Sequence, residues 1–197
     1  MKTVLRIVVP SICALLIFAC AASVQPVEMT EDVKNQTFLS RDVEAAAIYS
    51  VLLNKDPGNY LSDSSTLIIV NETYLGAETD DEVYFKSTDS FLEDETLVDF
   101  RSINEQKEEI NSLLSVNKPY EYMSPAELIL HLDEGQDWIS THTVTSFSKV
   151  GFNNKLDQAL VYMGHFCGRD CASGSVYFLV RENHVWKIRN IIFSWVS

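Results

Sequence analysis

The stretch that decides the fold is Gln158-Ala159-Leu160-Val161-Tyr162-Met163-Gly164-His165. Its central residues are apolar at successive positions, so an extended chain here would bury both of its faces. We therefore predict a strand in the middle of a sheet. On either side, apolar and polar residues alternate over 144–152, 175–180 and 185–196, which predicts neighbouring strands. Trp186, Ile188 and Ile192 are expected on one face of the last strand.

Short polar segments separate these strands. Residues 153–155 and 182–184 contain Asn, which tolerates positive φ, and we expect each to turn the chain. Residues 167–174 are predicted to be a loop, and Cys167 and Cys171 within it are predicted to form a disulfide. So short a closed loop would contribute roughly 2 kcal/mol. A redox-active pair would normally have two intervening residues and a helix N-terminus, and neither is indicated here.

Four earlier segments carry signals for helices or a strand. Ser40 can cap a helix whose apolar residues recur at helical spacing up to a stop at 54–59. Residues 66–70 are aliphatic and predict a buried strand, and 91–104 predict a helix. Ser124-Pro125-Ala126-Glu127 has the form of a capping box with Pro in the first helical position, which predicts a further helix. A short helical piece is also expected around 137–139.

Together these elements predict an α+β fold with a four- to five-stranded antiparallel meander sheet packed against helices on one face. The strand from Gln158 to His165 would lie near the middle, and the helices beginning at Ser40 and Ser124 would cover that face. By analogy alone, such a sheet would look cystatin-like. We expect a single domain over residues 39–197, preceded by a tether over 20–38.

The N-terminus has the pattern of a secretory signal peptide over residues 1–19. Two basic residues, Lys2 and Arg6, precede a short apolar run that ends in small residues. Ile17-Phe18-Ala19-Cys20 resembles a bacterial lipobox, which predicts a lipoprotein that carries its palmitate-type anchor on Cys20. Ordinary cleavage after Ala19-Cys20-Ala21 is the alternative. Either way we expect an exported protein of the cell envelope, in the periplasm or at the outer membrane.

The charge limits the choice of partners. Without Lys2 and Arg6, the formal net charge falls from −13 to −15. Six basic and three acidic residues lie within 148–197, so the acidity is concentrated in the remainder of the chain. Nucleic acid is therefore excluded as a partner, because phosphates need Lys and Arg to neutralise them. We expect the membrane as a partner through the lipid anchor, with an envelope protein or glycan as a further candidate.

Few residues point to chemistry. His165 and Arg169 are weak candidates for a site, because both lie beside the cysteine loop at the end of a strand. Nucleophile-elbow, zinc-protease and phosphate-loop motifs are absent, and the sequence predicts no metal and no cofactor. The acidic run at 78–82 is expected to be a solvated loop, since it lacks the spacing of a calcium loop.

Three functional hypotheses remain open. The first is a non-enzymatic cell-envelope protein with a binding role. The second is an envelope hydrolase with a site near His165 and Arg169. The third is an inhibitor or immunity-type protein whose acidic part blocks a cationic partner.

The C-terminal part of the chain resembles a set of uncharacterised bacterial proteins, many of which have export signals. The resemblance covers roughly residues 120–197, with the two cysteines and Gly174 among its features. It rests on Ser148-Lys149-Val150-Gly151-Phe152-Asn153, Gln158-Ala159-Leu160-Val161-Tyr162, Trp186-Lys187-Ile188 and Trp195-Val196-Ser197, preceded by Met123–Leu128 and Asp137-Trp138. Asp137 departs from the Gly that commonly precedes this Trp, and a Tyr-Pro-Gly-Ser-like segment is missing, with His142-Thr143 near its place. The resemblance implies a shared fold and no particular activity.

Overall fold

The computed structural model describes residues 31–55, 66–74, 89–133, 138, 141–166 and 171–196. Several predicted features lie outside this part of the chain. They are the signal peptide at 1–19, the lipidated Cys20, the start of the tether, the acidic run at 78–82, Cys167 and Arg169. Among the described helices, none combines the length and the apolar character needed to cross a bilayer.

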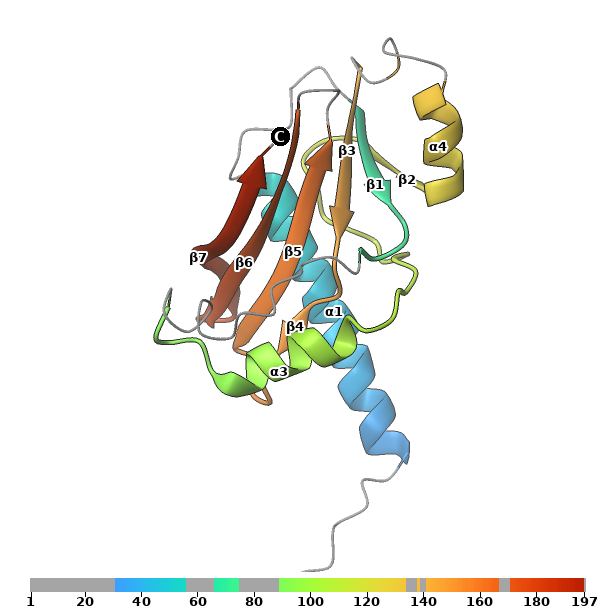
Figure 1. Ribbon diagram of the computed structural model, residues 1–197. Helices are drawn as coiled ribbons and strands as arrows, with labels where there is room; N and C mark the ends of the chain where they lie inside the picture. The colour runs from blue at the N-terminus through green and yellow to red at the C-terminus, as the bar shows by residue number, and fades with distance from the viewer. Residues whose placement is uncertain are drawn as a thin grey trace, which may run out of the picture.

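The described chain forms a seven-stranded sheet with helices on both of its faces (Figure 1). The strands run in the order β2-β1-β3-β5-β6-β7, and β4 pairs with β5 beside this path. Their bounds are Thr66–Val70 for β1, Tyr120–Met123 for β2, His142–Phe147 for β3, Gly151–Phe152 for β4, Gln158–Phe166 for β5, Ala172–Glu182 for β6 and Val185–Val196 for β7. The helices are α1 (Glu31–Lys55), α3 (Asp94–Ile103) and α4 (Pro125–Asp133).

The predicted fold class is wrong, because the sheet is mixed and larger than a four- to five-stranded antiparallel meander. The helices were expected on one face, but α1 and α4 pack on opposite faces. β1 is parallel to both β2 and β3, while β3, β5, β6 and β7 are antiparallel neighbours. Helix-containing connections separate β1, β2 and β3 along the chain, and connections of that length allow strands to be parallel. The four residues of β2 were not predicted as a strand.

The second half of the sheet is built from long strands joined by tight turns. β5 pairs with β6 from Gln158 opposite Val180 to Phe166 opposite Ala172, so β6 starts inside the predicted 167–174 loop. Asn183 and His184 have φ of 51° and 64°, which is the backbone of a two-residue hairpin turn.

One prediction for the last strand is also wrong. Two register shifts between β6 and β7 mark β-bulges, and a bulge changes the face to which the following side chains point. Trp186 and Ile188 therefore pack on the α1 face, whereas Ile192 packs on the opposite face.

The α1 face carries the larger core. Ile48, Leu52 and Leu53 of α1 are buried against strand residues such as Phe147 and Val161. α1 begins at Glu31 instead of the predicted Ser40, and it takes in the end of the segment assigned to a tether. Polar contacts also tie the helix down. The most buried of them is the Tyr49 hydroxyl, which donates to the Ser148 carbonyl at 2.9 Å.

Two short helices cover opposite ends of the other face. α3 packs its Leu97 and Phe100 on β5 and β6, and Gly151 lets the chain pass against α3, because a Cβ there would lie 2.3 Å from the Phe100 Cα. α4 begins with the predicted capping box. The Ser124 amide donates to Glu127 Oε2 at 2.9 Å, and the Glu127 amide donates to Ser124 Oγ at 3.2 Å.

Candidate functional site

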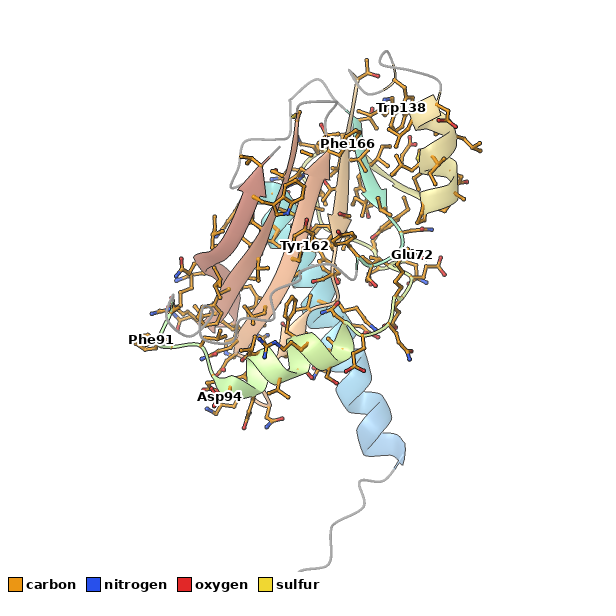
Figure 2. The ribbon with its side chains drawn as sticks, viewed as in Figure 1. Glu72, Phe91, Asp94, Trp138, Tyr162 and Phe166 are labelled. Carbon is orange, nitrogen blue, oxygen red and sulfur yellow. The ribbon has the colours of Figure 1, made fainter. Side chains whose placement is uncertain are left out.

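A groove of about 430 Å³ lies on the face of the sheet that carries α3 and α4, alongside α4. Pro125, Leu128 and Leu132 of α4 form one wall, and sheet residues form the floor. The floor side chains nearest α4 are Val70, Val144 and Phe166. Figure 2 shows Tyr162 near the middle of the sheet, Phe166 toward one end of β5, and Glu72 and Trp138 on the side of α4. The groove is therefore mainly aliphatic and aromatic.

Two paired glycines make room for the aromatic end of the groove. Gly164 of β5 lies opposite Gly174 of β6. A Cβ at Gly174 would lie 2.1 Å from Tyr162 Oη and 2.5 Å from Trp195 Nε1. A Cβ at Gly164 would lie 3.0 Å from both Ser146 Oγ and Tyr162 Oη. The glycines thus allow a phenol, an indole and a hydroxyl to lie directly against the backbone.

The Tyr162 hydroxyl is the central polar group at the aromatic end of the groove. The Tyr162 side chain is 4 % exposed, and its ring packs on that of Tyr74 with centroids 5.3 Å apart. Burial raises the pKa of the Tyr162 phenol, and the hydrogen bond from Trp195 acts in the opposite direction. The phenol is therefore neutral at physiological pH. Because its oxygen accepts from the Trp195 N–H, its own hydrogen is left to donate.

The charged groups at the edge of the groove neutralise each other. Lys107 Nζ lies 2.7 Å from Glu72 Oε1, and both side chains are substantially exposed. Such an exposed pair contributes little stability. However, Glu72 already compensates the positive charge of Lys107, so the groove has little net charge with which to bind a charged ligand.

The α4 wall is held to the sheet by few contacts. No residue of α4 is buried. Leu128 packs with Trp138 on Ile68, Val70 and Val144. Trp138 in turn lies between the rings of His131 and His142, with centroids 4.9 Å and 4.3 Å away. This wall is more lightly anchored than α1 and α3, which both bury several side chains, as expected for the side of a binding site.

His165, one of the two predicted site residues, borders the groove, but its side chain lies on the other face of the sheet. It follows Val161 and Met163 in the alternation of β5, and both of these pack in the α1 core. Its Nδ1 lies 3.0 Å from Thr145 Oγ1. The structure therefore does not bring this imidazole to the Tyr162 and Ser146 hydroxyls.

The remaining predicted site residues are only partly within the described chain. Arg169 and Cys167 lie outside it, so the disulfide to Cys171 stays a prediction. Among the described residues, no group of three or more His, Cys, Asp or Glu is arranged to hold a metal ion.

A smaller cavity, of about 240 Å³, lies between α1 and residues 149–152. Two of its charged residues are engaged in ion pairs, Arg41 with Asp99 and Lys149 with Glu108. Burial is the main cause that raises the pKa of Tyr49, which also lines this cavity. These contacts connect α1 to its surroundings, and we assign the cavity a structural role.

Sequence reasoning missed the groove. Tyr162 and Trp195 were not singled out as site residues, and Gly164 and Gly174 were given no role in a site. The signal that could have found it is a glycine inside each of two strands rich in large residues, since such glycines mark close approach of other groups to the backbone.

Comparisons of this chain with protein-family models, with curated proteins and with solved structures find no match.

Proposed function

We propose that this protein is a non-enzymatic binding protein of the cell envelope that holds a small apolar ligand in the groove between α4 and Tyr162. One observation carries the proposal. The aliphatic side chains of α4 form one wall of the groove, and aromatic side chains form its other end. The Ser146 and Tyr162 hydroxyls lie next to the backbone of the paired glycines. Small-molecule sites typically have this composition, with volumes of about 300–1,000 Å³.

The hydroxyls in the groove favour binding over catalysis. A serine nucleophile or a phenol acid needs a base or a charged partner within hydrogen-bond distance. Within the described part of the chain, neither Ser146 nor Tyr162 has a carboxylate or imidazole as a hydrogen-bond partner. The hydrolase and inhibitor hypotheses have no comparable observation in their favour.

The envelope setting is consistent with such a ligand. The N-terminal pattern predicts export and a lipid on Cys20, which would keep the protein beside a membrane. Membranes are a source of apolar molecules, so an apolar groove would meet its ligand there.

Titration with the fluorescent probe N-phenylnaphthylamine tests the proposal. The wild-type protein is expected to bind it with saturable enhancement of fluorescence. Leu132→Arg should lower the affinity at least about tenfold, because a charge in the apolar wall must be desolvated when the probe binds.

Leu130→Arg is the matched control. Leu130 is on the same helix and 66 % exposed, and it is not part of the groove lining. It should bind the probe like the wild type. Equal binding by the wild type and Leu132→Arg, with both proteins folded by circular dichroism, would contradict the proposal.

A further inference from the structure

The polar groups of the groove indicate which kind of apolar ligand it takes. This inference rests on the proposed function. We propose that the ligand is an uncharged acyl compound, an ester or amide of a fatty acid, whose carbonyl oxygen accepts a hydrogen bond from the Tyr162 hydroxyl.

The position of the donor is fixed by its neighbours. Tyr162 Oη lies against Gly174, and its ring is buried and packed on Tyr74. The Trp195 N–H occupies one acceptor position of the phenol oxygen, so the hydroxyl hydrogen is directed away from the indole. A donor held in this way loses little freedom when a ligand binds.

A second hydroxyl lies beside the first. Ser146 Oγ and Tyr162 Oη are each 3.0 Å from the point that a Cβ of Gly164 would occupy. Both oxygens therefore lie beside the backbone of Gly164, on the same face of the sheet and at the same end of the groove. A carbonyl oxygen has two lone pairs and can accept from two donors, so it matches this pair.

The charges argue for a neutral ligand over a free fatty acid. Glu72 and Lys107 line the edge of the groove, and they pair with each other at 2.7 Å. No further Lys or Arg lines the groove within the described part of the chain. A buried carboxylate without a paired cation is strongly disfavoured, whereas an ester carbonyl needs only a hydrogen bond.

The remaining surface of the groove suits an acyl chain. Leu128 and Leu132 on α4 face Val70, Val144 and Phe166 on the sheet. Each methylene that leaves water for this surface should raise the affinity about fourfold. The chain would supply most of the affinity, and the carbonyl would supply the selectivity.

Competition against N-phenylnaphthylamine tests the inference with three compounds of equal chain length: monodecanoylglycerol, decanoate and decanol. The monoester is expected to displace the probe at a concentration at least about tenfold lower than decanoate. Tyr162→Phe should weaken the monoester about fivefold to tenfold more than it weakens the probe, as loss of one neutral hydrogen bond implies.

Tyr122→Phe is the control for loss of a phenol hydroxyl. The Tyr122 hydroxyl donates to the Ser112 carbonyl at 2.7 Å, and its ring packs against the α1-face core, away from the groove. It should leave the preference for the ester unchanged. If the wild type binds the probe but the ester and decanoate compete equally, or if Tyr162→Phe keeps the preference, the inference is overturned while the binding function stands. Absence of probe binding by the wild type would overturn both.

Discussion

The two faces of the sheet are covered in different ways. On one face a single long helix, α1, buries Ile48, Leu52 and Leu53 against the strands. It is also tied down by side-chain contacts, for example from Glu44, which accepts from the Trp186 indole at 2.6 Å and pairs with Arg181 at 2.9 Å. On the other face, two short helices cover the ends of the sheet and leave the groove alongside α4.

The difference separates stability from binding. The core under α1 is closely packed, and the cavity of about 240 Å³ beside this helix is lined by basic residues that are already engaged in ion pairs. On the other face, α4 packs less closely on the sheet and leaves the groove, which another molecule can fill. We therefore assign most of the folding free energy to the α1 face and the ligand to the α4 face.

The largest expected effect is a difference in stability between two leucine truncations, one on each face of the sheet. Leu52 of α1 is fully buried, and Leu52→Ala is expected to lower the free energy of unfolding by about 2–5 kcal/mol. Leu132 of α4 lies at the groove with part of its surface in water, and Leu132→Ala should cost about 1 kcal/mol or less. Urea unfolding of the two variants measures both values. Similar losses would show that the faces contribute equally.

A smaller effect is expected at the capping box that starts the groove wall. Ser124→Ala removes the hydroxyl that accepts from the Glu127 amide, and loss of such a cap costs about 1 kcal/mol. Because α4 has no buried residue, the loss should appear as faster amide hydrogen exchange within 127–133. Ser124→Thr keeps a capping hydroxyl and should exchange like the wild type. Unchanged exchange in Ser124→Ala would mean that other contacts hold the wall.

The smallest expected effect is a decrease in the stability of α4 at low pH, and it arises from the same capping box. Hydrogen bonds from the Ser124 amide and then from its hydroxyl lower the pKa of Glu127. A group whose pKa is lower in the folded state contributes stability above its unfolded pKa, and this contribution is lost as the pH falls through the folded pKa. The protection factors of the α4 amides, which are corrected for the pH dependence of intrinsic exchange, should therefore fall on acidification before those of β5 do. Glu127→Gln should remove the pH dependence, and its persistence in that variant would assign it to another group.

Local signals in the sequence predicted the elements well where one residue type decides the backbone. Ser124 and Glu127 form the expected box, and Asn183 turns the chain as expected. β5 is buried along nearly its whole length, in agreement with the apolar run at 159–163. These features depend on neighbours in sequence, which is why a single chain reveals them.

Features that depend on distant contacts could not be predicted. β2 has only four residues, and its partner β1 lies about fifty residues earlier in the chain. The bulges that turn Ile192 to the other face leave no mark in the pattern of apolar residues. The groove is formed by α4, two glycines of different strands and Trp195. These residues are far apart in the sequence, so no local pattern predicts that they lie close together.

The central claim is that the α4 face binds the ligand, and amide hydrogen exchange with and without N-phenylnaphthylamine tests it most directly. We predict that the saturating probe slows exchange within 70–74 and 125–133 and leaves 48–53 and 112–117 on the α1 face unchanged. Protection confined to the α1 face, or no protection at saturation, would contradict the account.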